Sequence, residues 1–205
     1  MIDILAQINA TSRGVRRDDE SVTVVMGRTY QASVEDVWDA LTDPDRIKRW
    51  LMPISGDLRV GGRFQLEGNA GGEILECDPP HRFRATFGDA SSLVEVRLRA
   101  DGDERTDFEF EHTVPIAMAV SGAGAFYVGP GWDGAVLGLD LFLRGETAAD
   151  PVEAANSEEA QRYSKESVLA WTSVIEKSGT ATAEEIAAGR QVALDQFAPG
   201  LDQPL

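Results

Sequence analysis

The stretch RTYQASVEDVWDALTDPDRIKRWL, residues 28–51, contains the signals from which the fold can be predicted. Ser33 can cap a helix, because its hydroxyl can accept a hydrogen bond from a backbone N–H of the first turn. Asp43 can cap a second helix in the same way. Pro44 suits the first position of that helix, where no N–H donor is needed. The stretch therefore predicts two short helices in tandem.

Both predicted helices place apolar side chains on one side. This stripe recurs at helical spacing and consists of Val34, Val37, Trp38, Leu41, Ile47, Trp50 and Leu51. It includes two of the four tryptophans of the chain. We expect Trp38 and Trp50 to be buried, either as part of the core or as the wall of a cavity.

Between residues 55 and 114 the apolar residues recur at every second position, which is typical of strands. Turn signals rich in glycine, proline and aspartate separate six such segments: GDLRV, GRFQLEG, GEILECD, HRFRATFG, SLVEVRLRA and RTDFEFEHTV. The segment VTVVMGRTY, before the two helices, is a further strand candidate. Because the connections are short and contain no helix, the pattern predicts an antiparallel meander.

The alternation also predicts what each face of this sheet carries. One face is apolar and consists of Phe64, Leu66, Phe83, Ala85, Phe87, Val94, Val96, Leu98, Phe108, Phe110 and His112. The opposite face is polar and consists of Arg63, Gln65, Glu67, Arg82, Arg84, Glu95, Arg97, Asp107, Glu109 and Glu111. A sheet with this pattern is covered on its apolar side only.

A helix at residues 131–145 is the predicted cover for the apolar face. Its apolar side chains recur at helical spacing; they are Trp132, Val136, Leu139 and Leu143. The glycine-rich residues 115–130 before it are weakly patterned, and we interpret them as a mobile connection. The segment GAGAFYVGPG within them has no lysine and lacks the placement between a strand and a helix that a phosphate-binding loop needs, so it does not indicate such a loop.

The two ends of the chain predict further helices. Residues 2–13 have the pattern of a short amphipathic helix, and VRRDDES after them indicates a polar connection. Near the C-terminus, helices are predicted from Ser157 to about Lys177 and from Thr182 to about Phe197. The first of these has an apolar stripe that needs a packing partner. We expect it to dock on the sheet domain or on a second subunit, so a homodimer stays open.

Charge and cysteine content restrict the partners and the location. The 205 residues have a formal net charge of −16, which repels nucleic-acid phosphates and anionic lipid, so we expect neither nucleic acid nor membrane as a partner. Cys77 is the single cysteine, which fits a reducing compartment, and we interpret it as a small buried apolar residue. The N-terminal residues do not resemble a signal peptide. The predicted location is cytoplasmic.

His112 is the polar residue that stands out on the predicted apolar face. Near pH 7 a histidine can donate, accept or act as a base; the structural alternative is a core histidine bonded to a backbone carbonyl. Glu73 or Glu76 could also point inward and act as an acid, although the pattern does not say which. Two histidines and one cysteine without ligand spacing predict no metal site.

The order of these segments resembles the START-like SRPBCC superfamily and, within it, the family named for activators of the heat-shock protein 90 ATPase. The resemblance spans residues 22–146 and rests on Val37-Trp38, Thr42-Asp43-Pro44, Trp50, Gly61-Gly62, Asp78-Pro79-Pro80 and Gly131-Trp132. It implies an α+β helix-grip fold, in which a curved antiparallel sheet surrounds a long helix and a cavity lies between them. The N-terminal helix and connection (1–21) and a helical C-terminal extension (147–205) lie outside it.

Many members of this superfamily bind hydrophobic small molecules. The resemblance therefore implies binding of an apolar or amphipathic small molecule, without a cofactor, and we favour binding over catalysis. The predicted lining consists of Phe64, Leu66, Phe83, Phe87, Val94, Val96, Phe108, Phe110, His112, Trp132, Val136 and Leu139. Two alternatives stay open: a cyclase- or dehydratase-type enzyme that uses His112 or an inward glutamate, and a module that interacts with a chaperone or a regulator.

Overall fold

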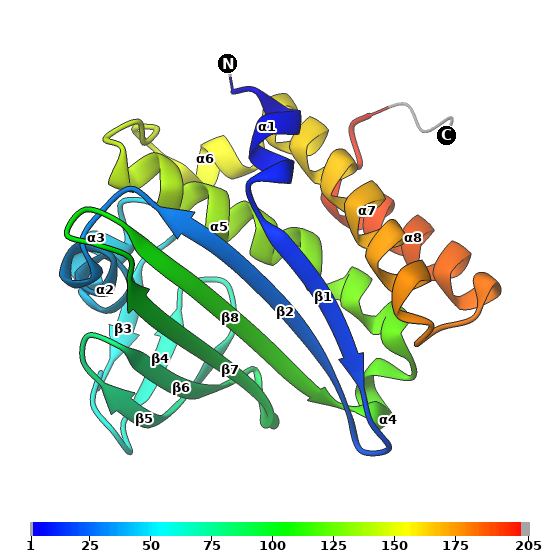
Figure 1. The fold of residues 1–205 in the computed structure, drawn as a ribbon, viewed down its shortest axis with the longest axis horizontal. Coiled ribbons are helices and arrows are strands. Elements are labelled where there is room, and N and C mark those ends of the chain that lie inside the picture. Colours follow the sequence, from blue (N-terminus) through cyan, green and yellow to red (C-terminus); the bar gives the residue numbers. More distant parts are fainter. Residues whose placement is uncertain (1, 202–205) are drawn as a thin grey trace. The chain divides into compact units, whose positions relative to one another are not determined.

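The computed structural model describes residues 2–201 and contains one antiparallel sheet of eight strands. Their order is β1-β2-β8-β7-β6-β5-β4-β3 (Figure 1). The strands are β1 (Ser12–Arg17), β2 (Ser21–Tyr30), β3 (Ile54–Gly56), β4 (Arg63–Leu66), β5 (Gly71–Asp78), β6 (Arg82–Phe87), β7 (Asp89–Ala100) and β8 (Thr106–Pro115). The predicted α+β class with an antiparallel meander is confirmed.

Helices lie before β1, between β2 and β3, and after β8. They are α1 (Ile4–Asn9), α2 (Val34–Thr42), α3 (Pro44–Ile47), α4 (Ile116–Ala119), the 3-10 helix η1 (Gly122–Tyr127), α5 (Gly129–Leu143), α6 (Pro151–Ala155), α7 (Glu158–Ser178) and α8 (Ala183–Phe197). The segment 115–130, expected to be a mobile connection, thus contains two short helices. Within residues 2–201, no helix has the length and apolar character needed to span a bilayer.

The chain forms two compact units, which are described separately. Unit 1 comprises the residues up to Met26, Val114–Leu137 and the residues from Glu153 on. Unit 2 comprises Gly27–Thr113 and Gly138–Val152. The boundaries predicted from sequence after residues 21 and 146 stay predictions, and residues 202–205 of the predicted extension lie outside the described residues.

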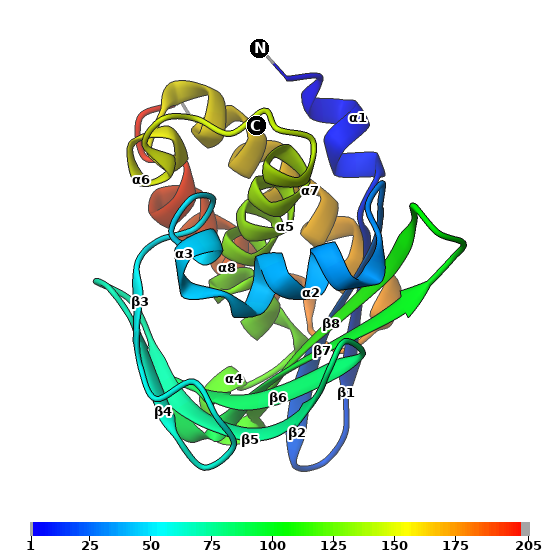
Figure 2. The ribbon, with the colours of Figure 1, turned by 90° about the vertical axis from the view of Figure 1, so that its left-hand side faces the viewer.

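The two tandem helices of unit 2 form as their caps predict. The Ser33 hydroxyl accepts a hydrogen bond from the Asp36 amide, and the Asp43 carboxylate accepts one from the Asp45 amide. Figure 2 shows α2 and α3 on the inner side of the curve that β3–β7 make. The ring of Trp38 packs edge-on against Phe83 with 6.1 Å between centroids. Both tryptophans of this stretch are buried.

The strand register of unit 2 confirms the predicted alternation. Val96 lies between Phe83 of β6 and Phe110 of β8, and Val94 lies opposite His112. Because residues directly opposite each other in a ladder have side chains on the same face, these residues share one side of the sheet. We call this side the inner face.

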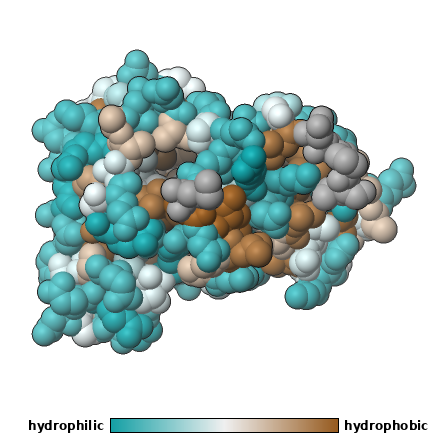
Figure 3. Space-filling model, turned by 90° about the horizontal axis from the view of Figure 1, so that it is seen from above, coloured by the Kyte–Doolittle hydropathy of each residue, from teal (hydrophilic) through white to brown (hydrophobic). Residues whose placement is uncertain are grey.

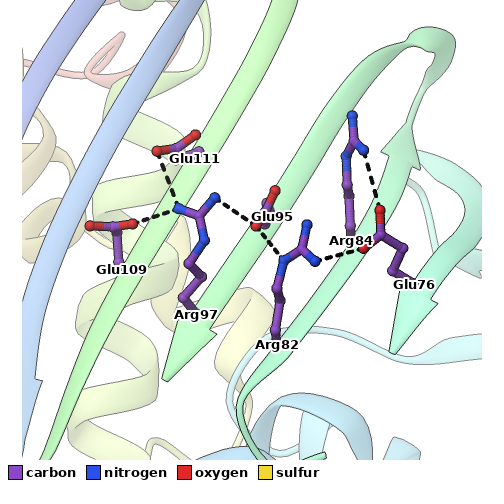
Figure 4. A network of polar contacts seen from close by, with 7 residues as sticks. All are labelled: Glu76, Arg82, Arg84, Glu95, Arg97, Glu109 and Glu111. Atoms are coloured by element: carbon purple, nitrogen blue, oxygen red, sulfur yellow. Dashed lines mark hydrogen bonds and ion pairs between the residues drawn. The ribbon is translucent and has the colours of Figure 1, made fainter. Parts of the chain in front are cut away.

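The other side of the same strands carries an ion-pair network (Figure 4). Its members are Glu76, Arg82, Arg84, Glu95, Arg97, Glu109 and Glu111. Partial burial raises the pKa of Glu95, but the ion pairs with Arg82 and Arg97 lower it by more. The pKa of Glu95 therefore lies below its ordinary value. The network confirms the predicted polar face. It also places Glu76 there, paired with two arginines, so Glu76 is not an inward acid.

Two segments differ from the sequence prediction. GDLRV was expected to be a strand, but β3 ends at Gly56, whose φ of +121° breaks the strand. A turn follows, in which the Gly62 amide donates to the Arg59 carbonyl. The polar segment after residue 11 was expected to be helix and connection, yet it forms β1. In β1 only Val15 is buried, and a single apolar residue gives no recognisable alternation.

Unit 1 is organised around the buried carboxylate of Asp133, near the start of α5. This side chain has 0% exposure. It accepts two hydrogen bonds from Arg13 of β1, at 2.9 Å from Nε and 2.8 Å from Nη2. From α7 it accepts hydrogen bonds from the Ser167 hydroxyl and from Trp171 Nε1, the latter at 2.9 Å. One carboxylate therefore joins a strand and two helices.

The C-terminal helices pack within this unit. Helix α7 contacts α1, β1, η1 and α8, and α8 also contacts η1. Thr182 and Glu185 form the predicted capping box at the start of α8. The apolar stripe of α7 is buried in the same chain, where Tyr163, Trp171 and Ile175 are almost fully covered. Whether a second subunit also contacts these helices stays a prediction.

We expect Asp133→Ala to destabilise the protein by about 3–5 kcal/mol, because it leaves the guanidinium of Arg13 buried without its carboxylate. The measurement is the free energy of unfolding in urea, followed by circular dichroism. Asp45→Ala is the matched control: it also removes an aspartate from an ion pair, but one at an exposed position, and should leave stability nearly unchanged. Equal stability of the two variants would contradict the role given to Asp133.

Candidate functional site

The inner face of unit 2 combines buried aliphatic residues with aromatic residues that stay partly accessible. Val94, Val96 and Phe110 are buried. Phe64, Phe83 and Phe87 keep part of their surface exposed. Partly accessible aromatic rings on the apolar side of a curved sheet offer contact area to an apolar molecule.

A hydrogen-bonded pair of polar side chains lies within this apolar face. His112 Nε2 and the hydroxyl of Ser92 lie 2.8 Å apart, and both residues are buried. The imidazole also meets the ring of Phe87 edge-on, at 5.8 Å between centroids. Burial lowers the pKa of His112 from 6.5 to about 4. The ring is therefore neutral near pH 7 and able to donate or accept hydrogen bonds.

The sequence prediction for His112 is thus partly confirmed. Its place on the inner face is as expected. The alternative of a core histidine assumed a backbone carbonyl as the partner, but one partner of His112 is the hydroxyl of Ser92. The signal for Ser92 was present in the sequence. Ser92, Val94 and Val96 alternate along β7, so the serine falls on the same face.

An ion pair on the inner face was missed from the sequence. Arg28 of β2 is buried, with 4% of its side chain exposed, and its Nη2 lies 2.9 Å from Oδ2 of Asp140 in α5. The guanidinium carbon lies 6.0 Å from the centroid of Tyr30. Arg28 could have been found, because it alternates with the buried residues Met26 and Tyr30.

Most of the residues predicted to line a ligand site lie in one unit. Ten of them lie in unit 2: Phe64, Leu66, Phe83, Phe87, Val94, Val96, Phe108, Phe110, His112 and Leu139. Leu139 is almost fully buried. Trp132 and Val136 lie in unit 1, so their part in the site stays a prediction.

Cys77 corrects one interpretation. It was taken for a small buried apolar residue, but it is exposed. The remaining burial of its thiol, together with the charge of Asp78, raises its pKa, so the thiol is a weak nucleophile at neutral pH. The position of Cys77 explains its exposure, because it lies near the end of β5, one position before the last residue of the strand.

The described residues form two hollows, the first of which shares Phe64 with the inner face. The first, of about 330 Å³, is lined by Ser55, Gly56, Arg63, Phe64, Gln65, Gly71, Gly72 and Gly88 in unit 2. The second, of about 460 Å³, lies in unit 1 and is lined by Ile4, Leu5, Arg162, Lys165, Glu166 and Leu201. Figure 3 shows apolar surface among hydrophilic residues on the side of the molecule that carries α1. Leu5 is 61% exposed there. Neither hollow has a buried polar pair like that of the inner face.

Comparison with known proteins identifies similar chains. Residues 31–140 match the model of the family described as activator of Hsp90 ATPase homolog 1-like protein. CalU16 from Micromonospora echinospora is 37% identical in its crystal structure, with a TM-score of 0.66, over 81% of this chain and 98% of CalU16. Its solution structure gives 36% identity and a TM-score of 0.68, over 82% and 97% of the two chains.

A more distant structure shows the same fold. EF2215 from Enterococcus faecalis, a conserved protein of unknown function, is 16% identical, with a TM-score of 0.63 over 83% of this chain and 95% of EF2215. At this identity the likeness concerns the fold alone. A search among curated proteins found no match.

The buried neutral His112 predicts a pH dependence of stability. Because its pKa is lower in the folded state, the unfolded state binds the additional proton as the pH falls, and stability decreases from about pH 6.5 to about pH 4. At about 1.4 kcal/mol per pKa unit, the loss is of order 3 kcal/mol.

The measurement is urea unfolding at a series of pH values in that interval. His112→Asn should remove this part of the pH dependence, because asparagine does not titrate. His81→Asn is the control, since His81 is exposed, and it should keep the dependence of the parent protein. The same slope in both variants would show that His112 does not cause it.

Proposed function

We propose that this protein, which belongs to the family of activator of Hsp90 ATPase homolog 1-like proteins as its motifs predicted, binds an apolar or amphipathic small molecule on the inner face of its sheet. Its partner would be a small molecule, and the predicted cytoplasmic location is kept as part of the proposal. Catalysis is not required for this function.

The observation that carries the proposal is the neutral pair His112–Ser92 beside the partly accessible ring of Phe87. Binding sites for small molecules are mostly apolar and contain a few polar groups that fix the orientation of the ligand. A neutral imidazole suits this role, because it can bond to a polar group of the ligand without a charge to desolvate. The ten predicted lining residues of unit 2 are the proposed site, with Trp132 and Val136 as additional candidates.

The Ser92–His112 hydrogen bond also favours a second candidate, an enzyme in which histidine activates serine. A nucleophile and a base must lie within about 2.6–3.2 Å, and this pair satisfies that distance. However, a base with a pKa of about 4 is poorly matched to proton abstraction near pH 7. We therefore place binding before catalysis.

Phe87→Asp should abolish binding of an uncharged fluorescent apolar probe such as N-phenyl-1-naphthylamine. The substitution puts a carboxylate beside His112 on an apolar face, where its desolvation is unfavourable. Titration of probe fluorescence measures the dissociation constant. Val192→Asp also introduces an aspartate at an apolar position, but an exposed one of α8, and should leave the dissociation constant unchanged. If both variants bind like the parent protein, the inner face is not the site.

His112→Asn distinguishes binding from catalysis. In a binding protein the substitution replaces one neutral hydrogen bond, which contributes about 0.5–1.5 kcal/mol, so affinity should fall by about tenfold at most. In an enzyme it would lower turnover about a hundredfold to ten-thousandfold and leave affinity nearly intact. We expect the first result. A parent protein that binds no probe would instead favour the module that interacts with a chaperone or regulator.

A further inference from the structure

Helix α4 ends in a backbone conformation that L-amino acids rarely adopt. Val120 has a φ of +64° and a ψ of −51°, and the Ser121 amide donates to the Ala119 carbonyl at 2.7 Å. This is a γ-turn with a positive φ at its central residue, a form that is rare and strained. Strain is greater for a β-branched residue, whereas glycine adopts a positive φ at little cost. The turn therefore stores strain at Val120.

The residues around Val120 hold this turn in place. Ala119 and Ser121 are buried. The Gly122 amide donates to the Thr180 carbonyl at 3.0 Å, and a Cβ on Gly122 would lie only 1.8 Å from Oγ1 of Thr180. Strained backbone persists only where the surrounding structure fixes it. The buried neighbours and the connection between α7 and α8 thus fix the conformation of Val120.

Two apolar side chains are exposed at this strained turn. Val120 is 68% exposed, and Met118, two residues earlier in α4, is 53% exposed. A single exposed apolar residue is ordinary, but here exposure coincides with strain, and packing accounts for neither. Strained residues cluster at sites of binding and switching. A fixed turn also presents its side chain to a partner at a low cost in entropy, so Val120 has the properties of an anchor.

The turn lies beside the end of the hairpin that β1 and β2 form (Figure 1). The Val120 amide donates to the Ile116 carbonyl, and the Ile116 amide donates to the Glu20 carbonyl, both at 2.8 Å. Two hydrogen bonds thus connect the exposed valine to the hairpin end, while Gly122 connects the turn to Thr180 on its other side. The charges of these two segments therefore surround the exposed side chains.

Carboxylates outnumber cations in the two segments. Residues 16–20 and 177–185 contain five acids and three bases: Asp18, Asp19, Glu20, Glu184 and Glu185 against Arg16, Arg17 and Lys177. Arg17 donates to the Thr180 carbonyl at 3.3 Å, and the Asp18 carboxylate accepts from the Glu20 and Ser21 amides. Within residues 2–201, none of the three hairpin acids pairs with a cation. A partner with positive charge suits this surface.

We propose that Val120 and Met118 form a docking surface for a segment of another protein that carries apolar side chains among lysines and arginines. A second copy of this chain suits the surface less well, because each copy has a net charge of −16. The small exposed area is typical of a weak, transient interface. The inference does not rest on ligand binding, since this surface belongs to unit 1 and the inner face to unit 2.

The test uses a fluorescein-labelled amphipathic peptide of leucine and lysine. It is titrated by fluorescence anisotropy at about 0.15 M salt, where distant charges are screened. Two companion peptides carry glutamate in place of lysine or serine in place of leucine. The wild-type protein should bind the leucine–lysine peptide about tenfold more tightly than either companion, because only this peptide offers both apolar contact and complementary charge.

Val120→Gly separates docking from a structural role. The variant lacks the apolar side chain, so its affinity for the leucine–lysine peptide should fall about tenfold. It also relieves the strain, which exceeds the entropy that glycine adds to the unfolded chain, so the melting temperature should rise by about 2–4 °C. A valine that acted only through packing would lower the melting temperature when removed. Met118→Ser should also weaken binding, and it leaves the turn unchanged.

Matched controls test the apolar and the charged parts separately. Val192→Ser also removes an exposed valine side chain, from α8, and should leave the affinity unchanged. Asp19→Asn/Glu20→Gln should lower the affinity for the leucine–lysine peptide. Asp103→Asn/Glu104→Gln changes the net charge equally, at the exposed turn between β7 and β8, and should not lower it.

Each contrary outcome overturns the inference. Equal affinities of Val120→Gly and the wild-type protein would show that the valine is not an anchor, and a lower melting temperature of this variant would show that it acts through packing. Equal binding of the three peptides, or equal effects of the two charge variants, would remove the basic partner. A wild-type dimer that dissociates in Val120→Gly, measured by analytical ultracentrifugation, would assign the surface to a second copy instead.

Discussion

The buried carboxylate of Asp133 is the interaction on which unit 1 depends. A charge with no exposure is tolerated only when hydrogen bonds replace its water, and here Arg13, Ser167 and Trp171 supply them from β1 and α7. Since each donor must point at the same two oxygens, the strand, the start of α5 and the middle of α7 have little freedom relative to one another. Packing of the apolar stripe of α7 adds stability, but the hydrogen bonds to the carboxylate fix how β1, the start of α5 and α7 are aligned.

Helix α5 uses the same chemistry a second time, in unit 2. Asp140 follows Asp133 by seven residues, about two turns, so both carboxylates project from the same side of the helix. The two sites differ in the number and charge of the groups that surround the carboxylate. At Asp133 one guanidinium and two neutral donors surround one carboxylate, whereas at Asp140 two guanidinium groups share one oxygen. The two guanidinium groups at Asp140 also differ in exposure, because the side chain of Arg28 is buried whereas that of Arg144 is 37% exposed and pairs with Glu146 as well.

Sequence patterns were sufficient for the sheet and the tandem helices, because each of these elements depends on near neighbours. Ser33, Asp43 and Thr182 cap helices a few residues away, and the alternation along β7 and β8 separates the two faces without reference to distant residues. Arg13 and Asp133 are 120 residues apart, and no local pattern predicts such a pair. Strand β1 was missed for a similar reason, since its Arg13 pairs with the distant Asp133 of α5 and the strand has no apolar periodicity of its own.

The apolar residues of the candidate site could be predicted from the sequence, whereas its polar residues were harder to predict. Alternation located Phe83, Phe87 and Phe110, because apolar residues on one face of a strand give a regular signal. Ser92 and Arg28 obey the same alternation, but polar residues at such positions are easily interpreted as interruptions of the pattern. A carbon surface alone would bind apolar molecules with little discrimination. In the proposed binding site, the polar side chains that break the pattern, His112 and Ser92, are the ones able to discriminate between ligands.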